Sequence, residues 1–156
     1  MKIMDFLNKK AITTDLKAGD KKGSIKELVE LFTRSGEVKP KDKESLVKIL
    51  LDRERLGSTG IGQGVGIPHG KSSNVKKLIG AVGISKPGVE FDSLDGEPAH
   101  IFFLLIAPQE SAGPHLKALA RISRLLKDKY FRDMLKNAPN AKELIRIISR
   151  EDQKKH

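Results

Sequence analysis

Residues 57–70, GSTGIGQGVGIPHG, surround the imidazole of His69 with glycines and a proline. Pro68 fixes the backbone φ angle just before His69, and Gly70 permits a close approach of other groups just after it. A neutral imidazole has one nitrogen lone pair, which can act as a nucleophile when an acceptor holds the other ring nitrogen. The segment could therefore hold a nucleophilic histidine, although Pro-His-Gly alone is more typical of a structural histidine in a surface turn.

The same segment contains groups that could surround an anion. The hydroxyl groups of Ser58 and Thr59 are hydrogen-bond donors, and so are the backbone amides of glycines such as Gly70. An arginine is the natural counter-charge of a phosphoryl group, because its planar fork matches the phosphoryl oxygens. These residue types predict a phosphate-binding site made of Ser58, Thr59 and Gly70 around the histidine.

A helix predicted over residues 41–55 leads into this segment. Its apolar positions recur at helical spacing, and Arg53 continues their stripe after Leu46, Ile49 and Leu50. Glu54 borders the same arc, whereas Arg55 points away from it. The pattern alone leaves two interpretations of Arg53 open: a surface residue whose stem covers apolar surface, or the counter-charge of an anion at the loop.

Several other chemistries are excluded. The glycine spacing is not the dinucleotide fingerprint, and Gly70-Lys71-Ser72 lacks the glycine that a nucleotide-hydrolase loop needs at position 65. Ser58 lacks the context of a nucleophile elbow. The chain has no cysteine, and its histidines do not have the spacing of zinc ligands: His69, His100, His115 and His156. We expect no metal and no cofactor.

Composition limits the class of protein. A length of 156 residues suits one domain over residues 1–156, and 38% hydrophobic with 32% charged residues indicates a soluble globular chain. The net charge of +10 invites a nucleic-acid interpretation, but aromatic residues make up only 4% of the chain and the lysines are dispersed. We therefore expect a cytoplasmic protein with no nucleic-acid partner and no membrane insertion.

Helical and strand-like segments are mixed along the chain. The helices are predicted at 1–8, from Ser24 to Gly36 with Glu27 completing a capping box, at 41–55, at 114–127, and near 128–136 and 140–150. The strands are predicted at 11–16, 79–85 and 101–107. For helix 114–127 the expected core stripe is Leu116, Leu119, Ile122 and Leu126. The order predicts an α/β fold with a mixed parallel and antiparallel sheet flanked by helices.

The stretch LLDRERLGSTGIGQGVGIPHGKS resembles the active-site region of enzyme IIA domains of the fructose/mannitol class, which belong to the bacterial phosphoenolpyruvate-dependent phosphotransferase system. The resemblance spans nearly the whole chain and implies the mannitol-type enzyme IIA fold. It also implies that His69 accepts a phosphoryl group on Nε2 from the phosphocarrier HPr or a nitrogen-branch paralogue, with Nδ1–H held by a backbone carbonyl. Arg53 matches the family's arginine, and His115 matches its second histidine. Gly66 departs from the family, which commonly has alanine there.

His115 follows Pro114 at a predicted helix start, where amide donors and the macrodipole favour anions and disfavour an imidazolium. We expect a mostly neutral His115 that donates a hydrogen bond to phosphate; the alternative is a packed histidine at the helix start. A basic stripe follows on the same helix, formed by Lys117, Arg121 and Arg124. It is typical of a solvated face, or it steers an acidic regulatory partner.

Three functions remain open. The spelling of the glycine segment most resembles the nitrogen-related subgroup of enzyme IIA, whose members regulate target proteins. A second possibility is a sugar-pathway enzyme IIA that passes phosphate to a cysteine of enzyme IIB. The third is a binding module without phosphotransfer, against which the presence of Arg53, His69 and His115 argues.

Overall fold

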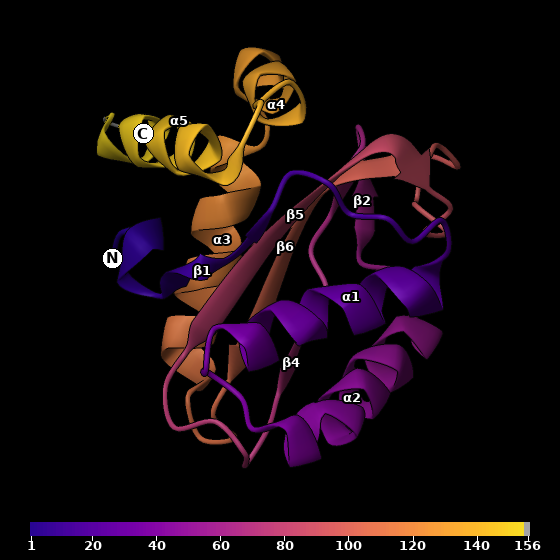
Figure 1. Cartoon of the computed structure of the whole chain (residues 1–156), viewed down its shortest axis with the longest axis vertical. Coiled ribbons are helices and arrows are strands. Elements are labelled where there is room, and N and C mark those ends of the chain that lie inside the picture. The colour runs from indigo at the N-terminus through magenta and orange to yellow at the C-terminus, as the bar shows by residue number, and fades with distance from the viewer. Residues whose placement is uncertain (155–156) are drawn as a thin grey trace.

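The computed structural model describes residues 1–154, in which helices cover both faces of a mixed β-sheet (Figure 1). The strands are β1 Leu7–Thr13, β2 Gly60–Gly62, β3 Val65–Gly66, β4 His69–Lys71, β5 Ile79–Val89 and β6 Ala99–Ala107. The helices are α1 Lys21–Arg34, α2 Lys43–Arg55, α3 Ala112–Leu125, α4 Lys129–Lys136 and α5 Ala141–Gln153. Short 3-10 turns cover Ile3–Asp5 and Pro40–Asp42.

The sheet confirms the predicted mixed class. Its order is β1-β5-β6-β3-β2, with β4 also paired to β6. β1 runs parallel to β5, while β5 and β6 form the long antiparallel pair at the centre. Both β3 and β4 run parallel to β6 along one edge of it. The segment around the histidine is therefore built onto the most buried strand of the molecule.

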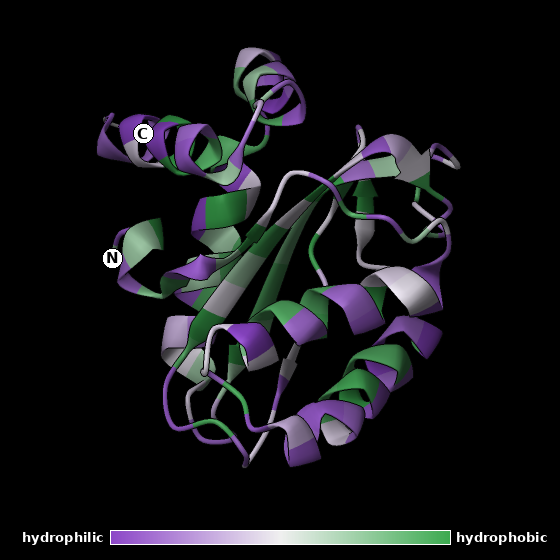
Figure 2. Ribbon diagram, viewed as in Figure 1, coloured by the Kyte–Doolittle hydropathy of each residue, from purple (hydrophilic) through white to green (hydrophobic). Residues whose placement is uncertain are grey.

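Strand β6 divides the core into two layers. Ile101, Phe103 and Leu105 belong to the cluster under α3, α4 and α5, whereas Phe102, Leu104 and Ile106 belong to the cluster under α1 and α2. This alternation is what a strand buried on both faces requires, because successive side chains point to opposite sides. Figure 2 shows the result as apolar central strands beneath helices whose outer faces are polar.

The prediction of a helix over residues 1–8 is wrong. Only a 3-10 turn forms at Ile3–Asp5, and strand β1 already begins at Leu7. The apolar spacing of Ile3 and Leu7 suits a helix, but pairing with β5 determines the conformation here. The turn is attached to the other end of the chain, since the Ile3 amide donates to the buried carboxylate of Asp152.

Helix α1 begins earlier than its predicted capping box. Asp20 is the N-cap and accepts from the Gly23 amide at 2.8 Å, whereas Ser24 is buried within the first turn. Glu27 instead accepts from the amides of Lys17 and Ala18, which arrive from the preceding loop. The predicted stop is confirmed, because Gly36 adopts a φ of +82° just beyond the helix.

Helix α3 begins at Ala112, and the face that it buries in the core differs from the predicted face. Ile122 and Leu126 are buried as expected, but Leu116 is 64% exposed and the buried position beside it is His115. The core arc consists of His115, Ala118, Ile122 and Leu125. The buried face of helix α3 thus contains the polar side chain of His115, whereas the hydrophobic pattern had assigned Leu116 to the core. Among the described residues, no helix is both long and apolar enough to cross a membrane.

Candidate functional site

The site is built on the short strand β4. Its residues pair in register with β6, His69 with Leu105 and Lys71 with Ala107. Pro68 has no amide hydrogen and ends the preceding strand segment, while its carbonyl accepts from the Leu105 amide at 3.0 Å. Because paired residues share a face of the sheet, His69 points toward the helix α3 layer, to which Leu105 belongs.

Gly70 points to the opposite face and makes room for helix α2. A Cβ atom at Gly70 would lie 2.9 Å from Cγ2 of Ile49, which is shorter than carbon atoms tolerate. The close approach at Gly70 is therefore made by helix α2, and the assignment of the Gly70 amide to a phosphate site stays a prediction. The consequence for the site is indirect: α2 packs directly on β4, which brings the end of α2 next to His69.

The His69 ring is held in one orientation. Its Nδ1 lies 2.8 Å from the carbonyl oxygen of Ile67, as the resemblance implies. A carbonyl only accepts, so the proton of the neutral ring resides on Nδ1 and the lone pair on Nε2. The residue is half-buried. The structure thus provides an oriented imidazole whose nucleophilic nitrogen is Nε2.

His115 packs beside it. The two ring centroids are 5.4 Å apart, and His115 is only 5% exposed. Its Nδ1 is buried and has no hydrogen-bond partner among the described residues. Burial, followed by electrostatic repulsion from His69 and Lys71, lowers the pKa of His115 below its ordinary value. This direction agrees with the expected neutral ring, but its main cause is burial rather than the helix terminus.

The lowered pKa makes a prediction about stability. At low pH the unfolded chain protonates His115 more readily than the folded protein does, so the free energy of unfolding should fall as the pH decreases below about 6.5, the ordinary value. This contribution ends once the pH passes below the folded-state pKa. Urea denaturation across this window should show a weaker pH dependence in His115→Gln than in the wild type. An unchanged dependence would contradict the assignment.

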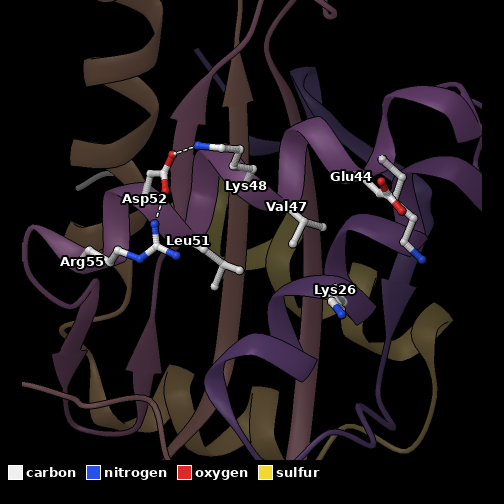
Figure 3. Close-up of a pocket in the computed structure, with 8 residues that line it drawn as sticks. Lys26, Glu44, Val47, Lys48, Leu51, Asp52 and Arg55 are labelled. Atoms are coloured by element: carbon white, nitrogen blue, oxygen red, sulfur yellow. Dashed lines mark hydrogen bonds and ion pairs between the residues drawn. The ribbon is translucent and has the colours of Figure 1, made fainter.

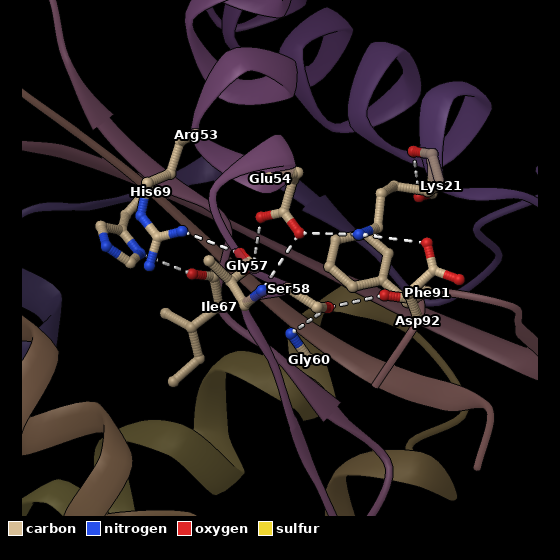
Figure 4. Close-up of polar contacts among 12 residues, drawn as sticks. Lys21, Arg53, Glu54, Gly57, Ser58, Gly60, Ile67, His69, Phe91 and Asp92 are labelled. Carbon is tan, nitrogen blue, oxygen red and sulfur yellow. Dashed lines mark hydrogen bonds and ion pairs between the residues drawn. The ribbon is translucent and has the colours of Figure 1, made fainter. Parts of the chain in front are cut away.

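The last turn of helix α2 sends its charged residues in three directions. Arg53 Nη1 donates to the carbonyl of Gly57 at 2.8 Å, and Figure 4 shows its guanidinium with the His69 ring at the loop. Glu54 is buried. Arg55 lies on the outer side, where it pairs with Asp52 and lines a groove of about 440 Å³ (Figure 3). Of these three residues, only Arg53 is directed to the histidine, as the resemblance implies.

Glu54 holds the glycine-rich segment in place, a role that the sequence analysis missed. It accepts hydrogen bonds from the amide and hydroxyl of Thr59, and it forms an ion pair with Lys21 of helix α1 at 3.1 Å (Figure 4). Ser58 in turn donates to the Phe91 carbonyl at 2.7 Å. Both hydroxyl protons therefore serve protein acceptors rather than, as predicted, an anion. The acidic residue directly after Arg53 was the only available signal.

Replacing Glu54 by alanine should loosen this segment. The Thr59 amide would be left buried without an acceptor, which costs about 1–3 kcal/mol in the free energy of unfolding. Chemical denaturation measures this loss. Asp52→Ala is the matched control, since Asp52 is an acid on the same turn whose partners are exposed. Equal stability of the two variants would contradict the role of Glu54.

The basic stripe of helix α3 is not a uniform solvated face. Lys117 and Arg124 are exposed, but Arg121 is half-buried and binds Asp152 through its Nε and, at 2.9 Å to the carbonyl, its Nη2. Arg121 therefore ties helix α3 to helix α5. Arg121, the central residue of the basic stripe, is therefore engaged within the protein, and only Lys117 and Arg124 are exposed.

The contacts of His100 and Gly66 are structural. His100 Nδ1 lies 2.9 Å from the Ser85 carbonyl, and His156 lies outside the described residues. Among residues 1–154, no group of three or more possible ligand side chains could hold a metal ion. At Gly66, a Cβ atom would lie 2.9 Å from the ring of the buried Phe102, which explains the departure from alanine by packing.

Comparison with known proteins decides the family. Residues 5–151 match the family described as "Phosphoenolpyruvate-dependent sugar phosphotransferase system, EIIA 2". The chain belongs to this family. It is accordingly a phosphotransfer component of the EIIA type, and the resemblance found in the sequence is confirmed.

The EIIA relatives fall into two groups. The chain is 36% identical over 149 residues to a nitrogen regulatory protein of Bradyrhizobium diazoefficiens, covering 96% of this chain and 95% of that protein. It is 37% identical over 153 residues to the fructose-specific EIIABC component of Bacillus subtilis, covering 98% of this chain but only 24% of that protein. The chain thus matches one relative over nearly its full length and the other over about a quarter of it.

Solved structures confirm the fold. The nitrogen regulatory protein IIA-Ntr from Neisseria meningitidis superposes with a TM-score of 0.85 at 34% identity, covering 94% of this chain and 98% of that one. IIA mannitol from Escherichia coli superposes with a TM-score of 0.76 at 22% identity, covering 90% and 97%, a likeness that concerns the fold alone. The predicted mannitol-type enzyme IIA fold is confirmed.

Proposed function

We propose that this EIIA chain is a phosphoryl carrier that takes a phosphoryl group on Nε2 of His69 from a phosphohistidine of HPr or of a nitrogen-branch paralogue. The single observation that carries the proposal is the 2.8 Å contact between His69 Nδ1 and the Ile67 carbonyl. It leaves Nε2 as the nitrogen with a lone pair. Family membership supports the choice of the phosphoryl group as the cargo.

The transfer step balances without a net movement of protons. The Nε2 lone pair of neutral His69 attacks phosphorus, and the P–N bond of the donor breaks with its electron pair remaining on the donor imidazole. The His69 ring becomes more positive as the new P–N bond forms, while its Nδ1–H stays on the Ile67 carbonyl. That hydrogen bond strengthens when its donor gains charge. The carbonyl therefore stabilises the phosphorylated ring as well as orienting the free one.

Arg53 and His115 would bind the phosphoryl oxygens. Arg53 has five N–H donors and gives one of them to Gly57, so the others remain for the transferring group. His115 in its neutral form would carry its proton on Nε2, because a proton on the buried, unpartnered Nδ1 would lack an acceptor. Charge spread over the equatorial oxygens is what phosphoryl transfer requires a site to stabilise.

Exposed apolar side chains adjoin the site and support a protein as the donor. Leu56 is 86% exposed beside Gly57, and Leu116 follows His115 on helix α3. Leu94 is 75% exposed, and its amide binds the glycine-rich segment at Gly60. Such residues are typical of surfaces that dock another protein.

A regulatory, nitrogen-related role is the form of this function that the comparisons support best, because a nitrogen regulatory protein at 36% identity is matched over 95% of its length. Phosphorylation would then switch the surface that a target protein contacts. A sugar-pathway carrier that passes phosphate to an enzyme IIB cysteine is the second candidate, favoured by the identity to the fructose-specific component.

Reconstitution tests the proposal. Incubation with phosphoenolpyruvate, enzyme I and the phosphocarrier should add one acid-labile phosphate to this chain, seen as a mass increase that disappears after acid treatment. No incorporation with either HPr or a nitrogen-branch paralogue would overturn the carrier function and leave a binding module. A chase with fructose-type enzyme IIB separates the two candidates: retention of the phosphate supports the regulatory role, and rapid loss to enzyme IIB supports the sugar pathway.

A further inference from the structure

The proposed phosphate site contains positive charges that no carboxylate neutralises. Arg53 bonds to a carbonyl oxygen, and no ion pair involves Arg53 or Lys71 among the described residues 1–154. By contrast, the half-buried Lys21 and Arg121 are each paired with a buried acid. Partial burial of a cation without a paired anion costs free energy, and binding of an anion beside it offsets that cost.

The geometry of β4 places Lys71 on the same side as His69. Residues two apart on a strand share a face and lie about 7 Å apart along it. Gly70, between them, faces Ile49 of helix α2, which fixes the alternation of the strand. Lys71 pairs with Ala107 at the end of β6, and it is half-buried. Its four-carbon stem can therefore run along the strand toward the two imidazoles.

His115 lies within electrostatic range of Lys71. The positive charge of Lys71 lowers the pKa of His115 further, after the larger effect of burial and that of His69. His115 and His69 are themselves in contact, with centroids 5.4 Å apart. Lys71 thus belongs to one cluster with both histidines, although it comes after the Pro-His-Gly motif and was assigned no role from the sequence.

We propose that the Lys71 ammonium binds an oxygen of the phosphoryl group carried by His69, as a cationic contact from strand β4 that complements Arg53 from helix α2. This inference rests on the proposed function. The two cations approach the phosphoryl group from different elements, so they neutralise different oxygens. Lys71 contributes more to the phosphorylated protein than to the free one, because only the former contains its anion. It therefore shifts the transfer equilibrium toward phosphorylated His69.

The test compares Lys71→Gln with Lys77→Gln, which removes the same charge from an exposed position in the loop after β4. Quench-flow with the phosphorylated phosphocarrier measures the forward rate and the final distribution of phosphate. We expect Lys71→Gln to lower the equilibrium constant for transfer by about 10- to 100-fold, the value of a charge-assisted hydrogen bond, while Lys77→Gln behaves like the wild type. Equal constants for the two variants would overturn the inference.

Lys71→Arg provides a check that does not depend on tolerance of a neutral residue. This variant keeps the charge, so its equilibrium constant for transfer should be higher than that of Lys71→Gln. An equilibrium constant as low as that of Lys71→Gln would overturn the charge-based role. NMR titration of the unphosphorylated proteins gives a second readout. The pKa of His115 should rise in Lys71→Gln and stay unchanged in Lys77→Gln, and an unchanged value in both would place Lys71 outside the cluster. A wild type that accepts no phosphate would instead refute the proposed function itself.

Discussion

Replacing His69 by alanine should abolish phosphate incorporation from phosphoenolpyruvate, enzyme I and the phosphocarrier. The reason is that, among residues 1–154, no other imidazole at the site combines an accessible lone pair with a fixed orientation. The His115 ring is 5% exposed, so a docked donor cannot reach it in line, whereas His69 is half-buried and anchored through Nδ1. Intact-mass measurement of the reaction mixture detects the phosphate directly.

His100→Gln is the matched control for this variant. Its ring also binds a backbone carbonyl through Nδ1, that of Ser85 at 2.9 Å, but it lies at the β5–β6 pairing rather than on β4. This variant should incorporate phosphate as the wild type does. Stoichiometric phosphate on His69→Ala would contradict the account, since another residue would then be the acceptor.

Replacing Arg53 by glutamine should slow phosphoryl transfer by about 10²- to 10³-fold, the effect that removal of one preorganised donor of transition-state charge has in other enzymes. Glutamine can still reach the Gly57 carbonyl but has neither the charge nor the fork of the guanidinium. Arg53→Lys should retain charge and recover only part of the rate. The rate constant is measured under single-turnover conditions with excess phosphorylated carrier.

Arg55→Gln provides the control on the same turn of helix α2. Arg55 pairs with Asp52 at the outer groove between α1 and α2 (Figure 3), and the residues that line this groove include neither His69 nor Arg53. Its loss changes the net charge by the same amount as the loss of Arg53. If Arg53→Gln and Arg55→Gln transferred phosphate at equal rates, the guanidinium of Arg53 would have no part in the reaction.

The parts of the molecule that were predictable from the sequence are those governed by local pattern. The continuous apolar run 101–107 became the two-sided central strand, and the helical spacing correctly placed Leu46 and Leu50 on the buried face of α2, while it left the role of Arg53 open. Pro68 and Gly70 indicated a constrained backbone at His69, but the loop expected there is wrong, because His69 lies on strand β4. In each case the controlling interactions lie within a few residues along the chain.

The missed features depend on partners that are distant in sequence. Helix periodicity at residues 1–8 was overridden by the pairing of β1 with β5. Arg121 was assigned to a surface stripe because its partner Asp152 lies 31 residues away in the sequence. The hydroxyl of Thr59 was assigned to an anion because Glu54, which accepts its proton, lies on the preceding helix. Tertiary contacts decide such cases, and one sequence does not display them.

The direct test is the position of the phosphoryl bond on the His69 ring. NMR of the ¹⁵N-labelled, phosphorylated chain distinguishes the two ring nitrogens through their coupling to ³¹P. Because the Ile67 carbonyl holds Nδ1–H, the bond should form on Nε2 of His69, with the Nδ1 proton retained. A phosphoryl group on Nδ1, or on any residue other than His69, would contradict the account.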